Sequence, residues 1–388
     1  MKKLLLILFC LPALVLAQQT YVPDDAFEGF LEANGMGNGI SNDDYVTTSN
    51  IDTVTILNIM YFLYPSDLTG IEDFTLLEQL DCSQLQLTSL DLSQNTALTD
   101  LICWGNQLTT VNISNNSALI NLDCQWNQLT SLDVSNNTAL EYLNCNGNEL
   151  ASLDVSNNTV LVELHCGDEF SGGNQLANLD VSQNILLTHL SVGDNQLTSL
   201  DVSSNTNLIS LICNQNWVLS SLDVSNNTLL NYFVCYDNQL TTLDLSNNIA
   251  LTYLMCQDNQ IQGALDLSGC NDLIEFNCGD NQLTSLDVRN GNNTNFIFFR
   301  CRGNSSLTCV NVDDTNWSTN NWTVVDLNID SHHYFSNNCP ATAIHEHTTI
   351  KELLKVTELF GRESKPQKNI PFIEIYDDGT VEKKITID

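Results

Sequence analysis

The chain has 388 residues, with 12 basic and 47 acidic side chains and a formal net charge of −35 at pH 7. Residues 18–340 hold three of the basic and 38 of the acidic side chains, and so strong a negative field repels nucleic acid and anionic membrane surfaces. The length would allow two or three ordinary domains. The dominance of Asn, Leu, Asp, Ser and Thr indicates instead one unit copied many times.

Residues 1–17 have the pattern of a secretory signal peptide. Lys2 and Lys3 precede an apolar run, and the run ends in a small residue, Ala17, before Gln18. This run is too short to span a membrane, and no other stretch of the sequence is a better candidate. We therefore expect a protein that is secreted or held at the cell surface, without a membrane span.

A period of 21 residues dominates the rest of the sequence. One copy begins at Leu98, and the next begins at Leu119. Each copy has a half of 10 residues and a half of 11, and both halves share the pattern L-x-x-L-x-(C/V/I/L)-x-x-N. The copies form eleven rungs. Insertions, such as that near residues 169–173, leave the register intact, as surface loops of a stacked array do.

Side chains within L-x-C alternate in direction, which is the period of a β-strand. Leu101 and Cys103 should therefore point inward, and Asp100, Ile102 and Trp104 outward. One coil cannot bury its own apolar side chains, so successive coils must stack.

The repeat resembles the leucine-rich-repeat family, in particular an internalin-like bacterial class with two nested L-x-x-L-x-L-x-x-N halves per repeat. The resemblance covers residues 54–304. It implies a β-rich, right-handed solenoid with a parallel β-sheet on its concave face. β-branched residues and Asn-Asn pairs predict a second half made mostly of extended segments or turns.

Asparagine recurs where each coil turns a corner, and a buried amide at such a corner can pair backbone groups that the turn leaves free. We therefore predict a structural ladder of asparagines. Its clearest members are Asn106, Asn127, Asn148, Asn195, Asn238, Asn259 and Asn281.

The first half of the repeat also carries a column of cysteines, from Cys82 to Cys301, interrupted by Val192. We interpret it as a stack of small apolar side chains, because neighbouring thiols with parallel Cβ directions suit disulfides poorly. The alternative is a redox or metal-binding array, but a metal site needs converging ligands rather than a line.

A column of aspartates occupies the second half. Hydrogen bonds to nearby Ser and Thr, together with counterions, would explain it. The alternative is a calcium-binding ladder, because carboxylate oxygens suit Ca²⁺; no other cofactor is expected. The candidate metal ligands are Asp133, Asp154, Asp180, Asp201, Asp223 and Asp244.

A solenoid needs caps at both ends, because its terminal coils would otherwise expose their core. Residues 18–53 are the expected N-terminal cap and contain a short helix that Asp24 or Asp25 could begin. Residues 305–340 are the expected C-terminal cap. Cys309 and Cys339 lie outside the cysteine column and are the candidate disulfide pair.

Residues 341–388 differ in composition, since Lys and Glu replace Asn and Asp. They resemble the C-terminal sorting domain of type IX secretion in Bacteroidota. The matching features are Leu-x-Gly-Arg ending at Arg362, the hairpin signal Asp378-Gly379 and a last strand with Lys383-Lys384. The Tyr-Pro-Asn-Pro-like start of full-length versions is absent. The resemblance implies a small β-structured tail that is recognised by the type IX secretion machinery.

Outward positions of the first half carry aromatic and histidine side chains among Asp and Asn, a mixture that suits contact with proteins or glycans. The candidate ligand residues are Trp104, Trp126, Tyr142, His165, His189, Tyr232, Tyr236 and Tyr253.

We therefore predict a non-enzymatic binding protein, expected to be a monomer, whose concave acidic and aromatic face contacts a protein or polysaccharide. The alternatives are a structural surface-layer component without a discrete ligand and a calcium-dependent adhesin. No G-x-S-x-G or H-E-x-x-H motif occurs, and so no catalytic residues are expected.

Overall fold

The computed structural model describes residues 18–59, 64–169, 172–340, 353–358, 372–376 and 381–384. The predicted signal peptide, residues 1–17, lies outside them. The chain forms two compact units, Met1–Cys339 and Pro340–Asp388. In the described residues, no helix is long and apolar enough to cross a membrane.

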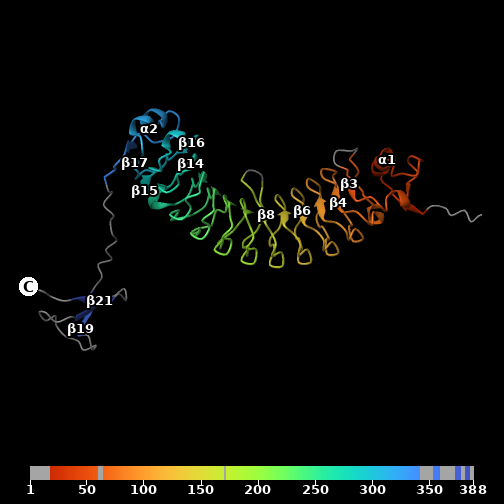
Figure 1. The fold of residues 1–388 in the computed structure, drawn as a ribbon, viewed down its shortest axis with the longest axis horizontal. Helices are drawn as coiled ribbons and strands as arrows, with labels where there is room; N and C mark the ends of the chain where they lie inside the picture. The colour runs from red at the N-terminus through yellow and green to blue at the C-terminus, as the bar shows by residue number, and fades with distance from the viewer. Residues whose placement is uncertain are drawn as a thin grey trace, which may run out of the picture. The chain divides into compact units, whose positions relative to one another are not determined.

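A 12-stranded parallel sheet runs the length of the first unit (Figure 1). Eleven of its strands belong to the eleven predicted rungs, and β3 comes from a degenerate coil before them. The strands are β3 (Ile56–Asn58), β4 (Gln79–Asp81), β5 (Asp100–Ile102), β6 (Asn121–Asp123), β7 (Tyr142–Asn144), β8 (Glu163–His165), β9 (His189–Ser191), β10 (Ser210–Ile212), β11 (Tyr232–Val234), β12 (Tyr253–Met255), β14 (Glu275–Asn277) and β16 (Phe298–Arg300).

Each strand has only three residues because the coil turns away directly after it. The middle residue, Leu101 in β5, and the cysteine that follows, Cys103, are fully buried. The equivalent residues pair in register from one strand to the next, as Leu101 does with Leu122. The predicted solenoid, with a parallel sheet on one side of each coil, is therefore confirmed.

The asparagine after each strand closes its coil. Asn106 Nδ2 donates to the carbonyl oxygens of Cys82 and Cys103, both at 2.9 Å, and its Oδ1 accepts from the backbone N–H groups of Leu85 and Leu87. One amide thus pairs four backbone groups in two adjacent coils. The other predicted ladder members listed above are also buried.

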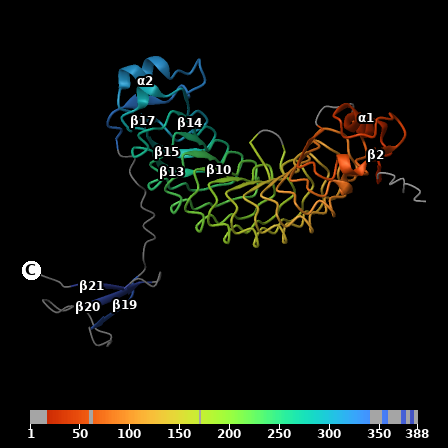
Figure 2. The same ribbon diagram turned by 45° about the vertical axis from the view of Figure 1, so that its right-hand side comes forward.

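The second half of most coils consists of tight turns, which Figure 2 shows as the row of loops along one side. A second ladder, formed by Asn116 and its equivalents, donates to carbonyl oxygens of the preceding coil. Towards the C-terminal end this side becomes a four-stranded parallel sheet. Its order is β13 (Gln262–Asp266), β15 (Gln282–Asp287), β17 (Cys309–Asn311) and β18 (Tyr334–Ser336).

The N-terminal end is covered by α1 (Asp25–Ala33) and by the antiparallel pair β1 (Gln19–Tyr21) and β2 (Tyr45–Thr47), between which α1 lies in the chain. Asp24 is the N-cap of α1, because its Oδ1 accepts from two backbone N–H groups of the first turn. Short 3-10 helices η1 (Thr48–Asn50) and η2 (Ile71–Asp73) lead into the coils. Phe27 packs on Phe74, which joins the cap to the core.

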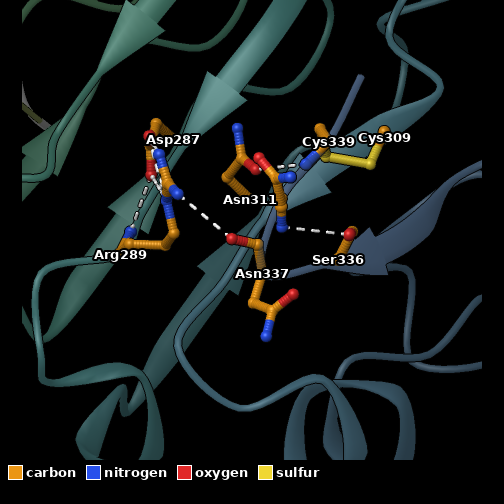
Figure 3. Close-up of a disulfide and its surroundings, with 8 residues drawn as sticks. Asp287, Arg289, Cys309, Asn311, Ser336, Asn337 and Cys339 are labelled. Carbon is orange, nitrogen blue, oxygen red and sulfur yellow. Dashed lines mark hydrogen bonds and ion pairs between the residues drawn. A yellow bond between two sulfur atoms is a disulfide. The ribbon is translucent and has the colours of Figure 1, made fainter. Parts of the chain in front are cut away.

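The C-terminal end is covered by α2 (Thr315–Asn321) and β18, reached after the 3-10 helix η3 (Asn293–Asn295). Trp322 stacks on Phe299 with ring centroids 3.8 Å apart, so aromatic side chains close the core. Cys309 and Cys339, the pair named from the sequence, are joined by a disulfide that ties β17 to the end of the unit (Figure 3).

The second unit contains a three-stranded antiparallel sheet. Its order is β19 (Leu353–Glu358), β20 (Phe372–Tyr376) and β21 (Val381–Lys384). The Asp378-Gly379 hairpin signal lies between β20 and β21, outside the described residues.

Candidate ligand-binding face

The outward side of the 12-stranded sheet, which we call the sheet face, carries most of the candidate ligand residues. In each strand the first and third residues flank the buried middle one, as Tyr142 and Asn144 flank Leu143. The row of coils is bent, and the sheet lies towards the inner side of the bend (Figure 1). A partner would therefore meet three-residue strands side by side, about 4.8 Å apart.

The insertion after β8 reaches across the sheet face with its described residues 167–169. The Ser191 hydroxyl donates to the carbonyl oxygen of Gly167 at its base. Glu169 is buried, and its Oε2 accepts from the Tyr232 hydroxyl at 2.8 Å. Its carbonyl oxygen accepts from the Tyr236 hydroxyl at 2.9 Å. Since β11 lies three strands from β8 in the sheet, these bonds hold the insertion over the intervening strands.

The tyrosines of β11 and β12 form a stack. The rings of Tyr232 and Tyr253 lie 4.2 Å apart with an interplanar angle of 10°. Burial, together with the charge of Glu169, raises the pKa of Tyr236 to about 12. It also raises the pKa of Tyr253 above its usual range. These phenols are therefore neutral at physiological pH and act as hydrogen-bond donors and flat apolar surfaces.

A second group surrounds Glu163. His165 Nε2 lies 3.5 Å from Glu163 Oε2, and His189 Nδ1 lies 4.0 Å from Glu163 Oε1. The Tyr142 ring lies 5.6 Å from that of His165. Burial lowers the pKa of His165, which favours its neutral form. The group offers polar and aromatic contacts to a ligand on β7, β8 and β9.

The two candidate tryptophans lie apart from these groups. Trp126 is 43% exposed and occupies the left-handed turn after β6, with φ of 55°. Its ring covers Gly147, where an added Cβ would come within 3.0 Å of it. Trp104 is half-buried and directly follows Cys103, just as Tyr236 directly follows Cys235 in a later coil. The structure thus brings six of the eight candidates into two groups and leaves the tryptophans at the N-terminal side.

Three aspartates, which we call the acidic rim, lie beside the tyrosine group. Asp237, Asp258 and Asp280 occupy a left-handed turn position, the third residue after strands β11, β12 and β14, with φ between 51° and 55°. Burial raises the pKa of Asp237. Burial and the negative charges of Asp237 and Asp280 raise that of Asp258. The negative charges of the rim repel one another, and the positive charge of Arg302 offsets part of this repulsion at Asp258.

Sequence reasoning missed both Glu169 and the acidic rim. The rim had a signal, because Asp precedes the ladder asparagine in the successive coils of Asn238, Asn259 and Asn281. Glu169 had none, since it lies 63 residues from Tyr232 in an insertion that breaks the repeat.

The aspartate column of the second half lies on the opposite side of the coils. The Oδ1 atom of Asp133 accepts from the backbone N–H of Ser135 at 2.9 Å, and Asp154 does the same with Ser156. Hydrogen bonds from these serines lower the pKa of both carboxyl groups.

In the described residues, groups of three possible metal ligands occur elsewhere. They are Asp25, Glu28 and Asp44 in the N-terminal cap, and Asp330, His332 and His333 in the C-terminal cap. Calcium binding along the column stays a prediction, which comparison of melting temperatures with calcium and with a chelator would test.

The structure is similar to solved leucine-rich-repeat structures. The functional domain of InlJ from Listeria monocytogenes, which includes a cysteine ladder, is 34% identical with a TM-score of 0.68, covering 76% of this chain and 68% of that one. The internalin InlF from the same species is 20% identical with a TM-score of 0.57, covering 82% and 96%. No protein-family profile and no curated protein matches the sequence.

Together, the nested repeat, the 12-stranded sheet and the identity to InlJ define the class of protein: a leucine-rich-repeat solenoid. Within that class, the chain belongs to the internalin-like family. Its buried cysteine column is a feature of its own fold, in which ten coils place a thiol in the core and one places Val192 there.

Proposed function

We propose that this protein is a non-enzymatic binding protein that uses the sheet face around its insertion loop to hold a protein ligand. The observation that carries the proposal is the gathering of aromatic and acidic side chains on one face, with Tyr232 and Tyr253 stacked beside the buried Glu169. Rigid aromatic side chains with polar neighbours give large contact area at low entropic cost. The stacked coils also present an extended surface of the kind that repeat proteins use for binding.

The test is binding of the full protein to arrays of surface-exposed proteins and of glycans. Tyr253→Ala should weaken binding by about tenfold or more, the usual cost of removing an aromatic residue at the centre of an interface. Trp217→Ala is the matched control, because Trp217 is 59% exposed in a turn that leaves the sheet. Uniform absence of binding, or equal loss in both variants, would favour a surface-layer component without a discrete ligand.

We further propose export to the cell surface or medium, with the C-terminal unit as a type IX sorting domain. Its three antiparallel strands support this role, as does its sequence, in which basic residues gather. Deleting residues 341–388 should leave the solenoid folded but retain it inside the cell envelope. Fractionation and immunodetection of the truncated protein would measure this, and normal surface display of the truncated chain would contradict it.

A further inference from the structure

An uncharged strip runs along one border of the 12-stranded sheet, where four successive coils turn from the second asparagine ladder into β9, β10, β11 and β12. The segments 184–190, 205–211, 227–233 and 248–254 of these coils contain no Asp, Glu, Lys or Arg. Five aliphatic side chains in the segments are 42–59% exposed. We call these five the aliphatic edge, which consists of Ile185, Leu186, Ile209, Leu229 and Ile249.

Backbone hydrogen bonds place the four segments side by side. The N–H of Ile209 donates to the carbonyl oxygen of Thr188 at 2.8 Å, and the N–H of Asn231 donates to that of Ile209 at 2.8 Å. The N–H of Thr252 continues the series to Asn231 at 2.9 Å. With about 4.8 Å between coils, the aliphatic edge is a patch about 15 Å long, in which Thr and Asn lie between the aliphatic side chains.

Equivalent positions of earlier coils show that folding does not require aliphatic side chains here. The first residue after the ladder asparagine is Ile185 or Ile249 in the edge, and the second is Leu186 or Leu229. The equivalents in three earlier coils are Thr96, Ser117 and Thr138 at the first position and Ala97, Ala118 and Ala139 at the second. Since the same turn forms with these small residues, the exposed Ile and Leu have another role. An exposed apolar patch typically marks a contact surface.

Charge decides which partner can cover this patch. The chain has a net charge of −35, so it repels anionic membrane surfaces and draws basic partners to its carboxylates. The four segments carry no carboxylate, and a basic partner would gain nothing by binding there. Two copies of this chain repel each other through their acidic surfaces, and they approach with the least repulsion where neither carries a charge.

We infer that two copies of this chain associate through the aliphatic edge, in place of the monomer expected from the sequence. A twofold contact sets the edge of one copy against the edge of the other and closes as a dimer. The aliphatic side chains form its apolar centre, and the exposed Thr206, Asn207 and Thr228 form an uncharged polar rim. Interfaces that bury about 800 Å² on each partner typically have such a centre and rim.

This inference does not depend on what the sheet face binds. The edge residues precede the strands and are not their outward residues. The dimer therefore carries two sheet faces, and two linked faces raise the avidity for a ligand that repeats on a surface.

Two variants of the full protein test the edge. The first combines Ile185→Thr, Leu229→Ala and Ile249→Thr, which installs residues that earlier coils already carry at these positions. The second is Thr228→Glu, which adds a negative charge to each edge at an exposed turn and removes no aliphatic group. Thermal unfolding followed by circular dichroism checks that both are folded. If the triple variant does not fold, Thr228→Glu alone decides.

A matched control removes the same kinds of side chain from another place. It combines Ile40→Thr, Ile56→Thr and Leu76→Ala, whose side chains are 51–62% exposed in the N-terminal part of the first unit. Sedimentation velocity from about 1 to 100 μM protein gives the dimer dissociation constant of each protein. We expect the control to match the unmodified protein within about threefold, and both edge variants to dimerise at least roughly tenfold more weakly.

The effect of salt tests the electrostatic part of the argument. Raising the salt from about 0.05 to about 0.5 M should tighten the dimer, because it screens the repulsion between two acidic chains and leaves the apolar contact in place. Weaker dimerisation at the higher salt concentration would overturn the inference, since the contact would then be ionic.

A monomer at every concentration and at both salt levels, or equal weakening by the edge and control variants, would also overturn the inference. If the protein is monomeric and the triple edge variant loses ligands on the protein array, the edge docks a different protein and the second copy is excluded. The proposed function fails separately, because Tyr253→Ala can leave array binding unchanged while the dimer still forms.

Discussion

Two asparagine ladders hold the coils together, and they differ in how completely they are hydrogen-bonded. In the first, Asn127 Nδ2 donates to the carbonyl oxygens of Cys103 and Cys124, and its Oδ1 accepts from the N–H of Leu108. In the second, Asn137 donates twice, but its buried Oδ1 has no partner among the described residues. The first ladder therefore satisfies more backbone groups per side chain.

This difference predicts an order of stabilities. Asn127→Ala leaves three buried backbone groups unpaired and should cost roughly 3–5 kcal/mol, at about 1–3 kcal/mol for each group before relaxation. Asn137→Ala leaves two and should cost roughly 2–3 kcal/mol. Chemical denaturation of the two variants measures both values. A larger loss for Asn137→Ala would show that the unpaired Oδ1 has a partner in solution.

Carboxyl groups on the two faces should respond oppositely to pH. Burial raises the folded-state pKa of Asp123, so its ionisation opposes folding at neutral pH. This loss of folding stability disappears as the pH falls through the raised pKa of the folded state towards the pKa of the unfolded state, about 3.9. The outer aspartates have lowered pKa values, so their contribution is present above about pH 3.9 and is lost only below it, at their folded pKa.

Asp123→Asn should therefore raise the melting temperature at pH 7, and the gain should vanish as the pH approaches about 4. Thermal unfolding followed by circular dichroism from pH 4 to pH 8 measures the change. Asp133→Asn is the control, since it removes an exposed carboxyl group whose pKa is lowered rather than raised. A gain for Asp123→Asn that is independent of pH would mean that packing, and not charge, is responsible.

Residues that repeat with the coil could be predicted from the sequence, because each occupies the same environment many times. The inward position of Cys103, the corner position of Asn106 and the outward position of Trp104 all follow from the strand period and the repeat. Glu169 occurs once, and its burial depends on two tyrosine hydroxyls more than sixty residues away. No local pattern encodes such a contact.

At the scale of elements, three-residue strands gain their stability from stacking, and the insertion gains its position from single side chains. The pairing of Leu122 with Leu101 and Leu143 recurs in every coil, so register is specified repeatedly. The insertion was predicted as a loop on one face. Its direction over the sheet face was not predictable, because nothing in the repeat distinguishes a loop that lies across the sheet from one that points away.

The C-terminal cap differs from the coils because a covalent bond closes it. The disulfide joins Cys309 to Cys339 across 30 residues, and Asn311 Oδ1 accepts from the N–H of Cys339 at 2.8 Å (Figure 3). Arg289 reaches the same region by donating to the carbonyl oxygen of Asn337. The cap is thus fastened to β15 and β17 on the side opposite the sheet face.

Replacing both cysteines by alanine should therefore destabilise the cap by about 3–4 kcal/mol, the loop-closure entropy expected for a loop of this length. Hydrogen exchange should increase in β17, β18 and α2 while β5 to β8 stay protected, because a solenoid transmits little between distant coils. Hydrogen exchange with mass spectrometry resolves these segments. Uniform loss of protection along the solenoid would show that the cap controls the stability of the whole unit.

At the scale of the molecule, the solenoid is a one-dimensional stack in which each coil contacts mainly its two neighbours. Parallel pairing runs without interruption from β3 to β16, and caps protect both ends. The length of the sheet face therefore depends on the number of coils, and its chemistry on the residues that each coil contributes. Removing a whole coil should shorten the face without changing the fold.

Deletion of residues 119–139, one complete period, places Leu140 directly after Ala118, where Leu119 stood. β5 should then pair with β7, and the protein should unfold cooperatively with a smaller m-value, because less surface is exposed on unfolding.

Deletion of residues 119–128, the first half of the coil alone, is the control. It removes fewer residues but breaks the period. It turns every later coil by half a period, so that Cys145 stacks on positions of the second half and the strands lose their partners. We expect this shorter deletion to abolish the cooperative unfolding transition. Equal stability of the two deletion variants would contradict the view that the 21-residue coil is the folding unit.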